Sequence, residues 1–114
     1  MNRSNQARGR WGEERAAAWY RDAGFTIVGR NWRAPGGELD LVARRGDLLV
    51  VCEVKARRHT GYGPPASAVG HAKQRRIRGL TAAWLRAHEV RGVDIRFDVV
   101  AITGTNLEVI EGAF

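Results

Sequence analysis

Residues 36–55 read GGELDLVARRGDLLVVCEVK and predict two strands joined by a tight turn. The first strand runs from Glu38 to Arg44, and the second, more apolar strand runs from Leu48 to Arg57. The connection Arg45-Gly46-Asp47 is too short for anything but an antiparallel hairpin. This hairpin is the organising element of the predicted fold, because its apolar second strand is typical of a central strand covered on both faces.

The predicted hairpin brings two acids and an amine together. When the turn is centred between residues 46 and 47, Asp40 lies opposite Glu53, and Lys55 shares a face with Glu53 because it is two residues further on. Regular alternation also places two sets of residues on opposite faces of the first strand: Glu38, Asp40 and Val42 on one, and Leu39, Leu41 and Ala43 on the other. Cys52 is expected on the apolar face as a buried, inert thiol.

Asp40, Glu53 and Lys55 are the residue types that phosphodiester hydrolysis needs. Magnesium prefers oxygen ligands from one or two carboxylates, and a bound cation relieves the repulsion between two close acids. Lys55 is suited to orient or deprotonate the attacking water, or to bind the phosphate. The alternative is an ordinary salt bridge on an exposed sheet face, but Glu53 lies in a strongly apolar stretch of sequence.

Two further acids have open roles. Glu13 lies on a predicted helix, one turn from the apolar stripe, where it completes the surroundings of a metal or simply favours the helix dipole. Glu38 is either a supporting group beside Asp40 or a solvated residue at the start of its strand.

The rest of the chain predicts an α/β domain with a mixed central sheet flanked by helices. Apolar residues at helical spacing predict a helix from about Arg10 to Ala23, and a second from His71 to His88. Further strands are expected over 25–33, 93–103 and 107–110, while residues 59–70 read as a loop and 1–8 as a flexible tail before one domain over 9–114. The second helix is long enough to bring the fourth strand parallel to a neighbour.

Charge placement indicates a polyanionic partner. The net charge is +7, and no acidic residue lies between Glu53 and Glu89, an interval that contains eight basic residues. The alternative explanation for these basic residues is a general preference for arginine in this chain. Against that preference the only two lysines, Lys55 and Lys73, stand out as positions where arginine would not serve. The N-terminal residues carry no apolar signal segment, so a cytoplasmic protein without a membrane span is expected.

The motifs resemble a known family. Glu13, Asp40 and Glu53-Val54-Lys55, in helix, strand, strand order, are similar to the PD-(D/E)XK nuclease superfamily and its archaeal Holliday junction resolvases. Over nearly the whole chain, the sequence resembles the YraN-like family of small bacterial proteins, through Gly12-Glu13, Arg30-Asn31-Trp32-Arg33, Gly37-Glu38-Leu39-Asp40-Leu41, Glu53-Val54-Lys55, Ala68-Val69, Lys73 and Phe97-Asp98-Val99-Val100. The chain has Leu39 where the superfamily's name has proline.

The resemblance implies a restriction-endonuclease-like core and a Mg²⁺ or Mn²⁺ site formed by Asp40, Glu53 and the carbonyl of Val54. It implies that Lys55 is the catalytic lysine and Glu13 the helix-borne acid, and that Lys73 or Gln74 faces the phosphate backbone. Together with the basic segment, this gives an expected nucleic-acid surface of Arg57, Arg58, Lys73, Gln74 and Arg76.

The leading expectation is a metal-dependent nuclease acting on DNA, with branched DNA as one candidate substrate. Two alternatives stay open: a nucleic-acid-binding module or nuclease subunit that uses the same groove without turnover, and a protein-interaction domain whose basic face meets an acidic partner. A homodimer would let so short a chain span two DNA arms.

Overall fold

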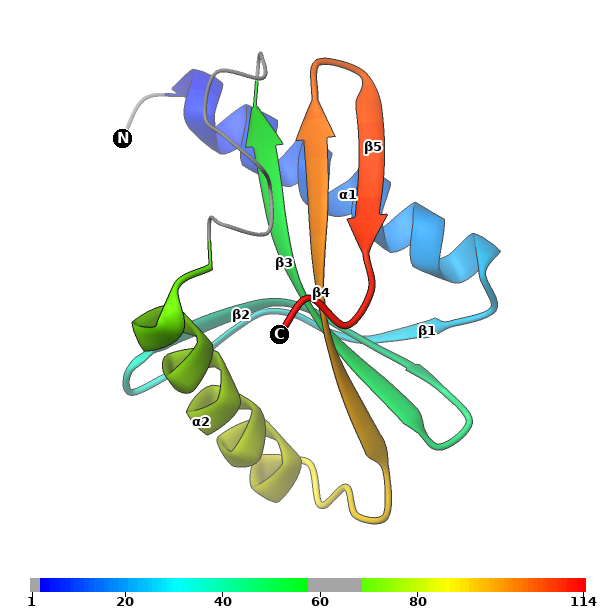
Figure 1. Ribbon diagram of the computed structural model, residues 1–114, viewed down its shortest axis with the longest axis vertical. Helices are drawn as coiled ribbons and strands as arrows, with labels where there is room; N and C mark the ends of the chain where they lie inside the picture. The colour runs from blue at the N-terminus through cyan, green and yellow to red at the C-terminus, as the bar shows by residue number, and fades with distance from the viewer. Residues whose placement is uncertain (1–2, 58–68) are drawn as a thin grey trace.

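The computed structural model describes residues 3–57 and 69–114, with side chains from residue 9 onward. Two helices and five strands follow the order that the sequence predicts (Figure 1). They are α1 (Arg3–Asp22), β1 (Thr26–Ala34), β2 (Gly37–Arg45), β3 (Leu48–Arg57), α2 (His71–Ala87), β4 (Asp94–Thr103) and β5 (Asn106–Ile110). Arg58 and the greater part of the predicted loop, 59–68, lie outside the described residues.

The strands form one mixed sheet in the order β1-β2-β3-β4-β5. The first three are an antiparallel meander, β4 pairs parallel to β3, and β5 returns antiparallel to β4. The predicted crossover is therefore confirmed: α2 carries the chain back so that β4 runs alongside the central strand β3. The result is a five-stranded α/β sheet with one helix on each face (Figure 1).

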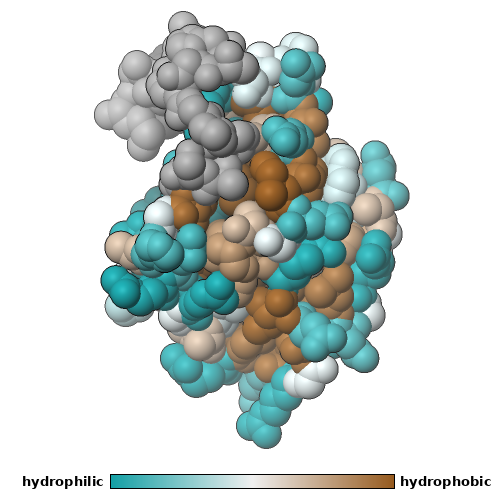
Figure 2. Space-filling view, in the orientation of Figure 1, coloured by the Kyte–Doolittle hydropathy of each residue, from teal (hydrophilic) through white to brown (hydrophobic). Residues whose placement is uncertain are grey.

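Each helix covers its own hydrophobic core. On one face, Ala16, Ala17 and Tyr20 of α1 pack against a cluster that includes Leu41 and Cys52. On the other, the apolar stripe of α2 packs against a cluster from the opposite face of the sheet, which includes Leu39, Val42, Leu49, Val51, Phe97 and Val99. Cys52 is a buried free thiol, as expected. Beside α2, Figure 2 shows apolar surface over the part of the sheet that this helix does not reach.

The hairpin register agrees with the sequence-based prediction. Leu41 pairs with Cys52 and Val42 with Val51, so the turn is centred between residues 46 and 47. The ladder between β2 and β3 ends at the pair Leu41–Cys52, although both strands continue beyond it. Residues 37–39 of β2 pair with β1 on their far side, and residues 53–57 of β3 pair with β4. We call this divergence of β2 from β3 the strand fork.

The expected alternation along β2 is wrong at the strand fork. Leu39 and Leu41 are two residues apart and should share a face, yet Leu39 packs in the α2 core and Leu41 in the α1 core. The same change occurs in β1, where Arg30 pairs with Glu14 of α1 while Trp32 packs in the α2 core. Both strands therefore rotate at one level, which is that of Asn31 and Asp40.

The first helix begins earlier than its apolar stripe indicates. It starts at Arg3 and not near Arg10, so the backbone of residues 3–8 is helical where the sequence predicts a tail. The apolar stripe marks the part of the helix that packs on the sheet, and a helical backbone does not require such a stripe along its whole length. Among the described residues, no helix is both long enough and apolar enough to cross a membrane.

Candidate active site

Asp40 lies in the strand fork and replaces part of the lost ladder. Its Oδ2 accepts a hydrogen bond of 3.0 Å from the backbone N–H of Val54. A carboxylate thus takes the place of the β2 carbonyl that a continuing ladder would provide. The N–H and C=O of one strand residue point toward the same neighbouring strand, so the carbonyl of Val54 also faces the fork.

Glu53 is a buried carboxylate next to this position. Its side chain is only 7% exposed, and its Oε2 lies 3.4 Å from Nζ of Lys73 on α2. Burial and the negative charge of Asp40 raise the pKa of Glu53 to about 7, and Lys73 opposes the rise. A carboxylate this buried is costly unless it is paired or serves a purpose, so Glu53 is no ordinary surface residue.

Lys55 lies on the same side of β3 as Glu53. Partial burial, and then the positive charge of Lys73, lower the pKa of the Lys55 amine, while Glu53 and Asp40 oppose that change. Two amines and two carboxylates therefore form one electrostatically coupled group at the fork. A lysine whose pKa is lowered exchanges protons more readily near neutral pH than a solvated one.

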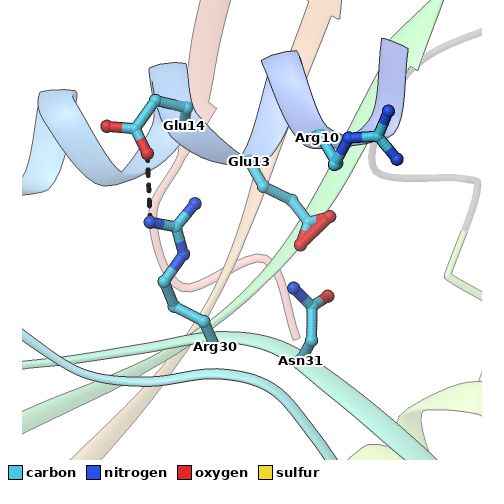
Figure 3. Close-up of a pocket in the computed structure, with 5 residues that line it drawn as sticks. All are labelled: Arg10, Glu13, Glu14, Arg30 and Asn31. Carbon is cyan, nitrogen blue, oxygen red and sulfur yellow. Dashed lines mark hydrogen bonds and ion pairs between the residues drawn. The ribbon is translucent and has the colours of Figure 1, made fainter. Parts of the chain in front are cut away.

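Glu13 approaches the site from α1. Its neighbour Gly12 lets the helix lie close on β3, since a Cβ atom at Gly12 would come 3.1 Å from Cβ of Ala56. Burial and the nearby charge of Asp40 raise the pKa of Glu13. Its Oε2 is buried without a hydrogen-bond partner among the described residues. Figure 3 shows its carboxyl group directed toward Asn31, in a pocket of about 350 Å³ lined by Arg10, Glu13, Glu14, Arg30 and Asn31.

The other predicted site residues lie outside the coupled group of Asp40, Glu53, Lys55 and Lys73. Glu38 forms an ion pair of 3.0 Å with Arg33 and still contributes to the negative field at Glu13. The Gln74 amide nitrogen donates to the Val69 carbonyl at 3.0 Å, so one of its donors is engaged within the protein. Exposed Arg76 reaches the β1–β2 turn, where a Cβ atom at Gly37 would lie 3.6 Å from its Cδ. Arg57 ends β3, and Arg58 lies outside the described residues.

The oxygen donors at the fork fit a hard divalent cation. Asp40 and Glu53 offer two carboxylates and Val54 a carbonyl, the ligand types that magnesium takes together with several waters. Among the residues whose side chains are described, no group of three or more histidine, cysteine, aspartate or glutamate residues is placed to hold a metal ion. A cation held by these three donors alone would keep part of its water shell.

Asn31 is a site residue that the strand pattern does not reveal. Its backbone is left-handed, with φ of 50°, and its side chain lines the same pocket as Glu13, where it lowers the pKa of that acid against the effects of burial. The available signal is the residue type, because asparagine is disfavoured inside strands and enriched in left-handed positions.

The fold and the site define a small α/β domain compatible with the restriction-endonuclease-like fold, with its acids at the point where two strands diverge. The chain belongs to the UPF0102 family, described as an uncharacterised protein family, whose profile matches residues 12–102. The resemblance to the YraN-like family is thereby confirmed.

Relatives match over most of their length. A UPF0102 protein of Acidothermus cellulolyticus is 46% identical over 97% of this chain and 96% of its own. UPF0102 proteins of Rhodococcus opacus and Rhodococcus jostii are 53% and 54% identical, each over 86% of this chain and 83% of their own.

Proposed function

We propose that this protein is a metal-dependent nuclease that hydrolyses DNA phosphodiester bonds, branched DNA included. The observation that carries the proposal is the meeting of Asp40 and buried Glu53 at the strand fork, with Lys55 and Lys73 beside them. A buried acid of raised pKa beside a second carboxylate and an amine of lowered pKa is typical of sites that move protons and bind cations.

Each residue of the site has a separate role in the proposed hydrolysis. Asp40, Glu53 and the Val54 carbonyl would hold Mg²⁺ or Mn²⁺, which would supply Lewis acidity and an acidified water. Lys55 exchanges a proton with the attacking water or binds the scissile phosphate, and its lowered pKa favours the first role near neutral pH. Lys73 is paired with Glu53 in this structure, and its amine would be available to the phosphate if that carboxylate held a cation.

The DNA backbone lies across the first turns of α2 in this proposal. Lys73 and Arg76 project from that part of the helix, and Arg57 ends the neighbouring strand. The first turn of α2 contains no acidic residue, so its positive end adds to the field beside Glu53. Binding should therefore depend on salt, because phosphate contacts release counterions. A second copy of the chain binding a second DNA arm stays a prediction.

The test is a cleavage assay on labelled single strands, duplexes, flaps and four-way junctions with Mg²⁺ or Mn²⁺. The wild type should cleave at least one substrate, and the isosteric variant Glu53→Gln should not. The matched control is Glu108→Gln, the same change at an exposed acid on β5, which should cleave like the wild type. Absence of cleavage on every substrate with both metals would remove the nuclease proposal.

One observation favours a second candidate, a binding module without turnover. Lys73 is already paired with Glu53, and among the described residues no group of three or more histidine, cysteine, aspartate or glutamate residues is placed to hold a metal ion. The basic surface at the start of α2 would therefore attract DNA without a cation. This alternative predicts salt-sensitive DNA binding that is unchanged in Asp40→Asn and independent of EDTA. The nuclease proposal predicts that divalent cations strengthen binding in the wild type and not in Asp40→Asn.

A further inference from the structure

The turn between β1 and β2, residues 35–36, forms a narrow tip. Pro35 and Gly36 are both exposed, and Gly36 and Gly37 have backbone φ of 104° and 143°, which glycine adopts without strain. No described atom lies within 4 Å of the place where a Cβ atom would stand at Gly36. The tip is therefore a thin projection without bulky side chains, and it lies at the edge of the molecule beside the start of α2 (Figure 1).

The tip is held in place by α2. Trp32 and Ala34, at the end of β1, pack against the α2 core. A Cβ atom at Gly37 would lie 3.5 Å from Cδ1 of Leu80 and 3.6 Å from Cδ of Arg76, so both side chains of the helix contact the start of β2. A hairpin supported in this way is preorganised, and a partner that docks on it needs little further ordering of the chain.

An arginine lies on each face of the tip. Trp32 and Ala34 point into the α2 core, so Arg33 between them points to the opposite face, where its side chain is 84% exposed. Exposed Arg76 lies on the α2 face. Arg33 forms an ion pair of 3.0 Å with Glu38, its partner in the ladder, but one carboxylate does not occupy all five N–H donors of a guanidinium. Two cations separated by the thickness of one hairpin suit a partner with two parallel lines of negative charge.

A groove of duplex DNA is bordered by two such lines, the phosphates of its two strands. Packed β-sheets stack about 10 Å apart, so one hairpin with its side chains is about 10 Å thick. The major groove is about 12 Å wide and admits a two-stranded β-ribbon, whereas the minor groove is only about 6 Å wide. The hairpin therefore fits the major groove and is too thick for the minor groove. Pro35 and Gly36 allow a close approach to the base edges and carry no group that reads them.

We propose that the β1–β2 tip docks in the major groove of a DNA duplex, with Arg33 against the phosphates of one strand and Arg76 against those of the other. The position of this contact relative to the cut rests on the proposed function. Asp40 is three residues from Gly37, about 10 Å along a strand, so the tip would lie about three base pairs from the cleaved phosphate. The substrate then needs a duplex arm beside the cleavage site, which a flap or a junction has and a single strand lacks.

Four variants of the tip and one control test the contact. Arg33→Gln removes the cation on one face, and Glu38→Gln removes the acid that pairs with it. Pro35→Glu places a carboxylate at the exposed tip, and Pro35→Gln is its neutral counterpart. Arg91→Gln is the matched control for the loss of one positive charge, because exposed Arg91 follows α2 at the end of the helix opposite to Arg76.

Binding to a labelled DNA duplex, a single strand and an RNA duplex is measured by fluorescence anisotropy in EDTA, so that cleavage plays no part. Arg33→Gln and Pro35→Glu should weaken DNA-duplex binding about 5-fold to 10-fold, and Arg33→Gln should also lower the salt slope by about 1. Single-strand affinity should stay within about twofold. Glu38→Gln should tighten duplex binding, while Arg91→Gln and Pro35→Gln should leave it within about twofold of the wild type.

Two further comparisons identify the groove. The major groove of an RNA duplex is too narrow for the hairpin, so affinity for RNA should not change in Arg33→Gln. Methyl green, which occupies the major groove of DNA, should displace the protein, and netropsin, which occupies the minor groove, should not. Displacement by netropsin alone would overturn the inference.

The outcomes for the tip and for the nuclease proposal are distinguishable. An equal loss of duplex and single-strand binding in Arg33→Gln would overturn the docking of the tip, because a groove contact needs a duplex. Wild-type duplex affinity in this variant would overturn it too, even if the protein is an active nuclease. If the wild type cleaves nothing, the nuclease proposal fails, while a loss confined to duplex DNA in Arg33→Gln and Pro35→Glu still supports the contact.

Discussion

The backbone N–H of Val54 donates to Oδ2 of Asp40 at 3.0 Å, at the point where β2 and β3 separate. One carboxylate therefore serves two needs. It satisfies a backbone donor that the broken ladder would leave unpaired, and it faces Glu53 across the fork. Structure and chemistry at Asp40 are coupled for this reason, and substitutions there should be chosen to separate them.

Asp40→Asn should separate the two roles. The amide oxygen still accepts from Val54, so the free energy of unfolding should stay within about 0.5 kcal/mol of the wild type, whereas Asp40→Ala should lose about 1–3 kcal/mol. Both variants should lose most of their Mn²⁺ affinity because they lack the charge. Urea denaturation and Mn²⁺ titration followed by electron paramagnetic resonance measure these effects. Wild-type Mn²⁺ affinity in Asp40→Asn would show that the cation does not bind at this carboxylate.

The stability of the metal-free protein should fall as pH rises through the titration of Glu53. Its pKa is about 7 in the folded protein against 4.5 ordinarily, so the folded state holds the proton more tightly. Stability contributed by this group is complete below about pH 4.5 and is lost by about pH 7, a change of at most about 3 kcal/mol.

Urea denaturation at pH 5 and pH 8 in EDTA measures this dependence. Glu53→Gln should remove the part of this pH dependence that comes from Glu53. The variant should be more stable than the wild type at pH 8, because its side chain stays neutral. Equal pH dependence in the variant and the wild type would contradict the assignment.

Lys73→Met should change the titration of both neighbours. Lys73 lowers the pKa of Glu53 through their ion pair and lowers the pKa of Lys55 by repulsion. Its removal should raise both pKa values, as measured by ¹³C NMR of the Glu53 carboxyl and the Lys55 Cε. Arg75→Met is the matched control, since exposed Arg75 lies two residues further along the same helix. Equal shifts in both variants would mean that net charge, and not the contact with Lys73, is responsible.

Lys55→Arg should separate proton transfer from charge. Arginine keeps the positive charge but does not deprotonate near neutral pH, so DNA affinity should stay within about twofold while kcat falls about 100-fold or more. Filter binding and single-turnover cleavage give the two quantities. A cleavage rate in Lys55→Arg equal to that of the wild type would leave only phosphate binding for this residue.

Asp98 should prove structural. It is fully buried and accepts hydrogen bonds from the Tyr20 hydroxyl at 2.6 Å, from the Arg96 guanidinium and from the backbone N–H of Gly112. Asp98→Ala should cost about 3–5 kcal/mol of unfolding free energy because it leaves Arg96 without its buried partner. Tyr20→Phe should cost about 1–2 kcal/mol.

The Mn²⁺ affinity of either variant, measured on folded protein at low temperature, should equal that of the wild type. A selective loss of metal affinity in Tyr20→Phe would connect this network to the strand fork and contradict a structural role.

Local patterns predicted most of the fold. The apolar stripes of α1 and α2, the short Arg45-Gly46-Asp47 turn and the length of the helical crossover were enough to predict the element order, the hairpin register and the parallel pairing of β4. These features follow from the spacing of apolar residues and from the lengths of the connecting segments. Both can be read from short stretches of the sequence.

The amino-acid sequence by itself determined the strands, the helices and the level at which Asp40 meets Glu53. Only the tertiary structure decided how the site is assembled: the rotation of both strands at Asn31 and Asp40, the approach of Glu13 from α1, and the contact of Lys73 with Glu53. Strand alternation assumes a regular backbone, and a single left-handed residue breaks it. The physical reason is that these contacts join segments far apart in the chain, whose relative positions are settled by packing against two separate cores.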